Sequence, residues 1–237
     1  MGDMYEGVHA HPDGDATVAR HALTAREDGF DGIVVRNHGD RQADYDAERV
    51  SDEYGVDVVE GIELRTDDRS QASGLVKRYR EERTILLVHG GETTMNRFAC
   101  EQPKVDVLAH PMCGDGDVNH VLAKAAAENG VRLEFDFGPV LRDDGGSRVR
   151  TIRGLRKLRE LVETYDVPYV VSTNPTSHLE LRAPRELVAV GEVVGFDAEQ
   201  VREGLREWGR LAARNRERQA EEFLEPGVRL ERDEEER

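Results

Sequence analysis

Lysine is scarce in this chain. Only four lysines occur among the 33 basic residues, whereas aspartate and glutamate together number 49, and the formal net charge is −16. An acidic chain with so little lysine is typical of proteins adapted to high salt, and we interpret it as halophilic. At molar salt the Debye length falls to about 3 Å. Distant repulsion is then screened, so the negative charge does not exclude RNA as a partner.

Cysteine and long apolar runs are also rare. Two cysteines, Cys100 and Cys113, form no C-x-x-C pair and are too few for a disulfide framework, so a reducing cytoplasm is the expected location. The first residues lack a basic and apolar leader, and no apolar run approaches the roughly 18 residues needed to cross a bilayer. We therefore expect no membrane partner. A P-loop and a G-x-S-x-G nucleophile motif are missing too.

What the sequence does contain is a regular alternation of short apolar runs with helical patterns. Such alternation predicts parallel strands joined by right-handed crossovers. Seven units without a break in composition favour one closed α/β barrel over the alternative, an open doubly wound sheet. The predicted strands cover residues 4–11, 32–38, 56–64, 84–91, 105–111, 131–138 and 168–174. The predicted helices between them cover residues 15–30, 43–55, 69–83, 93–102, 118–130 and 148–165.

Two more helices are predicted after the last strand. Pro184 suits the first helical position of residues 184–195. Asp197 and Gln200 form a capping-box pattern at the start of the next helix, which Trp208 is expected to anchor. We predict a single domain over residues 1–220 and an acidic, solvated and disordered tail over residues 221–237, because the tail has too few apolar residues to pack.

Histidine and carboxylate side chains recur where the predicted strands end. The sixth run contains Glu134 and Asp136, and Asn174 follows the seventh. Parallel β/α barrels gather their sites at these carboxyl ends. A single such histidine is usually a packed or surface residue, but repetition over consecutive strands predicts one shared site. The candidate metal ligands are His9, His11, His38, Glu63, His89, His110 and His178.

This spacing resembles the PHP superfamily, whose members are distorted seven-stranded, TIM-like β/α barrels that carry divalent metals. The resemblance lies in the H-x-H of His9 and His11, in the histidine of "RNH", in the glutamate of "GIE" and in "AHP". Asn37 and Asn174 stand where that superfamily usually has acidic residues. Losing two carboxylates weakens both metal binding and the activation of a metal-bound water. Zinc, manganese or magnesium remains open as a cofactor, and the histidines could instead only hydrogen-bond loops.

The second half of the chain resembles the archaeal ribonuclease P protein component 3 family. The similar segments are "HVLAK", the run that ends in "FGPVLR", the arginine-rich helix after it, "VPYVVST" and "LRAPRELVAVGEVVG". The resemblance implies a subunit of the ribonucleoprotein that removes 5′ leaders from precursor tRNA. It also implies that the RNA carries the catalytic centre, so we expect no catalytic residue here. The implied partners are ribonuclease P RNA, protein component 2, other holoenzyme subunits and, indirectly, precursor tRNA.

A basic island fits that role. Residues 142–159 carry a net charge of +5, whereas the rest of the chain sums to −21. Arginine forks bind phosphate bidentately, and arginines three residues apart share a helix stripe. The alternatives are a solvated face paired with nearby carboxylates and, for the whole protein, a metal-dependent phosphoesterase. The predicted RNA-binding residues are Lys124, Arg142, Arg148, Arg150, Arg153, Arg156, Lys157, Arg159, Arg182 and Arg185.

Overall fold

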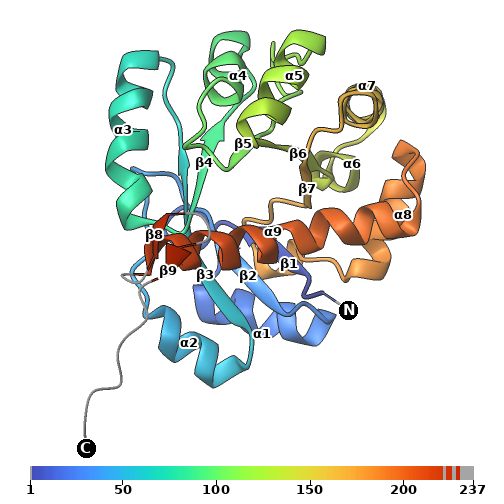
Figure 1. Ribbon diagram of the computed structural model, residues 1–237. Helices are drawn as coiled ribbons and strands as arrows, with labels where there is room; N and C mark the ends of the chain where they lie inside the picture. The colour runs from blue at the N-terminus through green and yellow to red at the C-terminus, as the bar shows by residue number, and fades with distance from the viewer. Residues whose placement is uncertain (1, 221–222, 226–227, 230–237) are drawn as a thin grey trace, which may run out of the picture.

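A computed structural model describes residues 2–220, 223–225 and 228–229. Seven parallel strands form one sheet that follows chain order and curls into a barrel (Figure 1). Each strand lies inside a run predicted from the sequence, and the barrel is confirmed over the open sheet. The strands are β1 (Tyr5–Val8), β2 (Gly32–Val35), β3 (Asp57–Leu64), β4 (Ile85–His89), β5 (Val107–Ala109), β6 (Arg132–Asp136) and β7 (Tyr169–Ser172).

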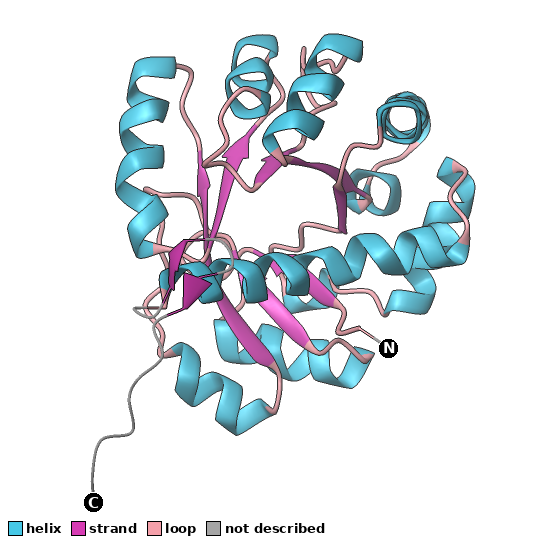
Figure 2. Ribbon diagram, viewed as in Figure 1, coloured by secondary structure: helices cyan, strands magenta, loops and turns pink. Residues whose placement is uncertain are grey.

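Helices surround the strands (Figure 2). The sequence analysis did not predict two short elements, α6 (Gly138–Arg142) and the 3-10 helix η1 (His178–Glu180). Segments of three to five residues are too short to show a helical period. The helices are α1 (Val18–Asp28), α2 (Ala47–Tyr54), α3 (Arg69–Glu82), α4 (Thr93–Cys100), α5 (His120–Asn129), α6 (Gly138–Arg142), α7 (Gly145–Tyr165), η1 (His178–Glu180), α8 (Pro184–Val194) and α9 (Ala198–Gln219).

The strands alternate between an outer face and an inner face, as successive strand side chains must. Ile33 and Val35 face outward into the core beneath the helices, whereas Val34 faces inward. The inner apolar cluster also includes Trp208 from α9, whose indole nitrogen donates to Val171 O at 2.9 Å. Other α9 side chains bond near the starts of β3, β4 and β5, as Asn215 does with Thr84 O. Thus α9 closes the amino end of the barrel, which leaves the carboxyl end for a site.

The barrel closes between β1 and β7 through a carboxylate. Glu6 is fully buried and accepts hydrogen bonds from Ser172 Oγ and from the backbone and hydroxyl of Thr173. Higher up, His9 N donates to Pro175 O at 3.0 Å. Burial raises the pKa of Glu6 to about 7, against the opposing effect of these hydrogen bonds. A side chain therefore joins the two edge strands of the sheet.

Beyond α9 the structure describes only a short antiparallel pair, β8 (Phe223–Glu225) with β9 (Val228–Arg229). The other residues of the predicted acidic tail, 221–222, 226–227 and 230–237, lie outside the described part of the chain. The solvation and disorder of the tail stay predictions. None of the helices in the described part of the chain is long and apolar enough to cross a membrane.

Candidate functional site

The carboxyl end of the barrel brings five of the predicted metal ligands together. His9, His38, Glu63, His89 and His110 come from the ends of the first five strands or from the residues just after them. The rings of His9, His38, His89 and His110 form a row with centroids 5.0 to 5.4 Å apart. The two-residue period points His9, His38, Glu63 and His89 inward. His110 breaks that period, since Val107 and Ala109 are the inward residues of β5, and its positive φ of 49° accompanies the turn toward the same carboxylate.

Glu63 is that carboxylate. His89 Nδ1 bonds to its Oε1, and His38 Nε2 and His110 Nε2 each lie 3.6 Å from the same oxygen. His9 Nε2 lies 3.7 Å from Oε2. Glu63 is fully buried, and burial would raise its pKa, but Arg36 and the histidines hold that pKa well below its usual range. Four imidazoles therefore converge on one ionised group.

Two further carboxylates orient the histidines from behind. Asp13 accepts from His9 Nδ1 at 2.7 Å and from His38 Nδ1 at 2.8 Å, and Asp136 lies 3.1 Å from His110 Nδ1. Each bond engages the Nδ1 side of a ring and leaves Nε2 facing Glu63. Carboxylates that hold histidines in this way are the usual outer partners of metal-binding histidines. Asp13 was not predicted from the sequence, since it lies in a turn rather than on a strand.

Arg36 supplies a fixed positive charge beneath the histidines. Its guanidinium is fully buried, lies 2.6 Å from Glu63 Oε2 and also pairs with Glu134. The room comes from Gly7, where a Cβ would lie 3.0 Å from Arg36 Cδ. The sequence analysis missed Arg36, although its inward position between Val34 and His38 could have revealed it. This cation offsets one of the two buried negative charges of Glu63 and Glu134.

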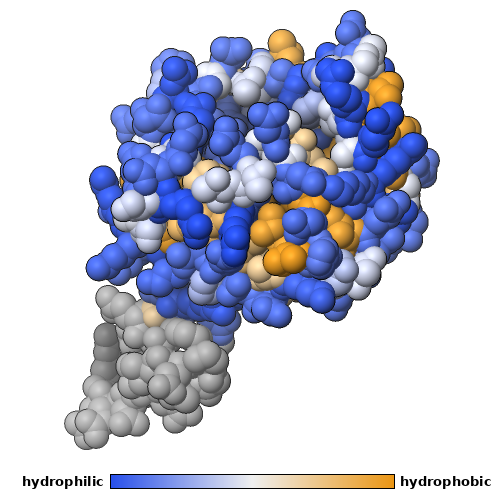
Figure 3. Space-filling model, turned by 90° about the horizontal axis from the view of Figure 1, so that it is seen from above, coloured by the Kyte–Doolittle hydropathy of each residue, from blue (hydrophilic) through white to orange (hydrophobic). Residues whose placement is uncertain are grey.

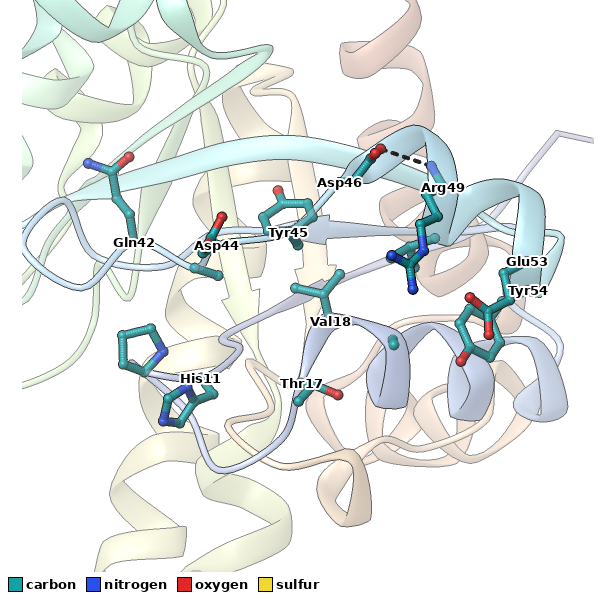
Figure 4. Close-up of a pocket in the computed structure, with 14 residues that line it drawn as sticks. His11, Thr17, Val18, Gln42, Asp44, Tyr45, Asp46, Arg49, Glu53 and Tyr54 are labelled. Atoms are coloured by element: carbon teal, nitrogen blue, oxygen red, sulfur yellow. Dashed lines mark hydrogen bonds between the residues drawn. The ribbon is translucent and has the colours of Figure 1, made fainter.

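His11 and His178 do not join the cluster. The chain turns after β1, with Asp13 N and Gly14 N both donating to Ala10 O, so strand alternation does not extend to His11. His11 is exposed instead and lines a separate cavity of about 570 Å³ between α1 and α2 (Figure 4). The loop after β7 crosses over β1 and carries His178 to η1, beside α1 and close to His21. The spacing of residues along the strands did not predict the positions of His11 and His178, because turns break the two-residue period of a strand.

The residues present fit one divalent ion. His38, Glu63 and His89 offer the nitrogen and carboxylate donors that suit zinc, and His110 Nε2 lies at the edge of this group, 3.6 Å from Glu63 Oε1. His38 Nε2 is buried without a hydrogen-bond partner among the described residues, as a ligand atom would be before it binds an ion. His38, Glu63 and His89 offer ligand atoms within 4.8 Å of one another, as do His9, Asp13 and His38.

The second candidate site is the outer side of α7. Leu155, Leu158 and Val162 are buried against the barrel, and Ile152 is half-buried. Four exposed arginines of α7 make no ion pair with any carboxylate in the described chain, and we call them the arginine face. They are Arg148, Arg150, Arg153 and Arg156.

The bonds of the arginine face leave its charge uncompensated. Arg148 donates to Asp143 O and Arg156 to Val193 O, both uncharged carbonyl groups. The guanidinium groups of Arg150 and Arg153 make no hydrogen bond within the described residues. Its neighbours on the helix differ: Lys157 lies 2.5 Å from Asp117, and Arg159 pairs with Glu163.

The other predicted RNA-binding residues lie around this helix in varied states. Lys124 lies over the Tyr165 ring at 5.5 Å, and Arg142 donates to Thr173 O. Arg182 donates to the carbonyls of Leu179 and Leu181, and Arg185 is exposed at the start of α8. Most of these cations therefore contact a carbonyl group or an aromatic ring close to them.

The face of the molecule in Figure 3 is mostly hydrophilic, and its largest group of apolar side chains lies in one area.

Fold and site together define a class: a seven-stranded parallel β/α barrel with a histidine–carboxylate mouth and a cationic helix on its rim. Over residues 4–220 the sequence matches the family described as RNase P subunit p30. The chain belongs to that family. It is a protein component of ribonuclease P, the endoribonuclease of tRNA 5′ maturation.

Relatives and solved structures agree. Ribonuclease P protein component 3 of Haloarcula marismortui is 68% identical over 230 residues, which cover 97% of this chain and 98% of the relative. The predicted halophilic, archaeal character is confirmed by such relatives. A chain in the structure of archaeal ribonuclease P with mature tRNA has a TM-score of 0.81 at 23% identity, covering 98% of this chain and all of that one. Histidinol phosphate phosphatase of Lactococcus lactis, solved with zinc, L-histidinol and phosphate, has a TM-score of 0.57 at 13% identity, covering 82% and 94%.

Proposed function

We propose that this subunit binds the RNA of ribonuclease P through the arginine face of α7. One observation supports the proposal above the others. In a chain with 49 acidic residues, four arginines on one helix have no carboxylate partner in the described structure. Guanidinium groups without an internal counter-ion are suited to bind phosphate from outside, through bidentate hydrogen bonds.

The second arginine-rich helix, α9, differs from α7 in how its arginines are paired. On α9, Arg206 and Arg210 pair with glutamates of the same helix, and Arg216 pairs with Asp57. Arginine content alone therefore does not distinguish the two helices. The lack of internal partners on α7 does, and it favours α7 as the RNA-binding element.

The double variant Arg153→Ala/Arg156→Ala tests this proposal in the reconstituted holoenzyme. We expect weaker RNA binding, slower cleavage of precursor tRNA, and a log–log salt slope reduced by about two, since each phosphate contact contributes about 0.9. The matched control is Arg78→Ala/Arg97→Ala, which removes the same charge from exposed, glutamate-paired positions on α3 and α4. Equal behaviour of the two folded variants would contradict the proposal.

The protein partners are a finer proposal. We infer that the subunit works in the cytoplasm beside protein component 2 and other holoenzyme subunits, and that it meets precursor tRNA only through the assembly. Exposed apolar side chains such as Leu179, which is 74% exposed, support contact with a protein. Affinity purification from the native cell should recover a structured RNA together with these subunits. Recovery of the chain alone would reject this assembly.

We also propose that the barrel mouth binds one divalent ion, preferably zinc, through His38, Glu63, His89 and His110. A bound ion would supply Lewis-acid chemistry, but this chain's own residues favour a structural role. Asn37 bonds to backbone groups at Ala10 and Arg41, and Arg36 already neutralises Glu63. Neither residue is placed to act as a base. This geometry supports metal binding without phosphoesterase turnover.

Metal analysis of dialysed protein tests the ion. We expect about one zinc per chain in the native protein and at least a tenfold weaker affinity in His89→Ala. His11→Ala is the matched control, because His11 lies outside the cluster. Native protein without metal would reject the site. Stoichiometric metal with manganese-dependent phosphatase turnover would instead favour the phosphoesterase alternative over a structural ion.

A further inference from the structure

A cavity of about 400 Å³ lies between the metal-site edge and the start of α7. This size is within the range of small-ligand pockets. Its walls come from three parts of the chain that the sequence does not connect. They are the loop after β5 (His110, Pro111, Met112, Cys113, Gly114), β6 with α6 and its end (Glu134, Asp136, Pro139, Asp143), and α7 (Ser147, Arg150, Thr151, Leu155).

The lining changes character with depth. Glu134 and Asp136 are almost fully buried and give the floor an acidic character, whereas Met112 and Leu155 give apolar walls. Arg150 is exposed at the rim, and its guanidinium makes no hydrogen bond within the described chain. Asp143 is the carboxylate of the lining that lies nearest to Arg150 in the sequence. It accepts a hydrogen bond from Ser147 Oγ at 2.7 Å and does not pair with Arg150.

We propose that this cavity holds one unpaired nucleotide of RNA, with the base inside and its phosphate on Arg150. The inference rests on the proposed function of α7 and adds a specific contact to it. An acidic floor repels phosphate and accepts hydrogen bonds from an amino group, so the base enters first. A base with an exocyclic amino group fits this floor, because carboxylates accept from such groups.

The neighbouring arginines support RNA over a free nucleotide. Arg153 and Arg156 follow Arg150 at three-residue spacing, so they continue one stripe of the arginine face away from the cavity. A strand that places one phosphate on Arg150 can place its next phosphates along that stripe. Only a nucleotide outside a duplex can turn its base into the cavity, and proteins recognise RNA sequence mainly at such unpaired positions.

Chemical probing of the RNA in the reconstituted holoenzyme tests the proposal. With saturating wild-type subunit, we expect one unpaired adenine, cytosine or guanine to be protected from dimethyl sulfate or kethoxal. Thr151→Phe fills the cavity from α7 without removing an arginine, and it should expose that nucleotide again. Arg150→Ala should expose the same nucleotide and lower the log–log salt slope by about one.

Arg20→Ala is the matched control, since the Arg20 side chain is also exposed and makes no ion pair within the described residues but lies on α1, outside the lining. It should leave the nucleotide protected. The proposal is overturned if no nucleotide distinguishes wild type from both folded cavity variants. Loss of binding in Arg153→Ala/Arg156→Ala with no such nucleotide would leave α7 as the RNA-binding helix and reject only the cavity.

Discussion

Arg36 shows how much one buried side chain decides at the barrel mouth. Its guanidinium pairs with Glu63 and Glu134, both fully buried, and its charge does not depend on pH in the physiological range. Without it, Glu63 and Glu134 would keep only their contacts with histidines and backbone groups, and an uncompensated buried charge costs several kcal/mol. One guanidinium offsets one of the two negative charges, so the floor beneath the histidines stays acidic.

Glu6 gives a pH-dependent prediction. Burial raises the pKa of Glu6 from 4.5 to about 7, so between these pH values the folded chain keeps a proton that the unfolded chain loses. Stability should therefore fall as pH rises from 4.5 to 7 and stay lower above. Glu6→Gln should remove this part of the slope, on the order of 3 kcal/mol.

Urea unfolding in molar salt between pH 4.5 and 8 measures this difference. The exposed Glu192→Gln serves as the control, and the wild-type slope should persist in it. Because other groups titrate in both proteins, only the difference between wild type and Glu6→Gln counts. If the free energy of unfolding changed with pH by the same amount in wild type and in Glu6→Gln, Glu6 would be ionised in the folded protein throughout this pH range.

At the scale of elements, α7 has two faces with separate tasks. Leu158 is fully buried against the barrel, and Arg153 on the opposite side is exposed. The apolar face fixes the helix in place, and the arginine face points outward, where no carboxylate of the described chain pairs with it. Stability and RNA binding should therefore separate by face.

Leu158→Ala should lower the free energy of unfolding by about 2–5 kcal/mol through the cavity that it leaves. Arg153→Ala should change the same quantity by no more than about 0.5 kcal/mol, as is usual for exposed positions. Urea denaturation of both variants checks the pair, and RNA binding is measured under conditions where both are folded. A strongly destabilised Arg153→Ala would mean that this arginine is structural.

At the scale of the whole molecule, the charge is unevenly distributed. Residues 142–159 carry +5 within a chain of −16, so the remaining surface repels itself. Raising salt from 0.1 M to 1 M shortens the Debye length from about 10 Å to about 3 Å. The protein should therefore become more resistant to urea as salt rises over this range. A midpoint that is constant or falls with potassium chloride would contradict this account.

Much of the fold was accessible from the sequence. Period-two apolar runs and period-3.6 helices predicted seven parallel strands in a barrel, and the strand-end positions of His9, His38, Glu63, His89 and His110 predicted their convergence. Pro184 and the capping box of Asp197 with Gln200 predicted where α8 and α9 begin. These features are local, because they follow from backbone geometry and from which residues a helix or strand end accepts.

By itself, the sequence determined the order of elements, the chemistry gathered at the strand ends and the surplus of positive charge on α7. Only the tertiary structure decided that His11 and His178 turn away, that Asp13 and Arg36 join the site, and which arginines remain unpaired. The physical reason is that partner choice depends on distance in three dimensions. Turns and loops set those distances, and they lack the regular residue period that makes strands and helices predictable from the sequence.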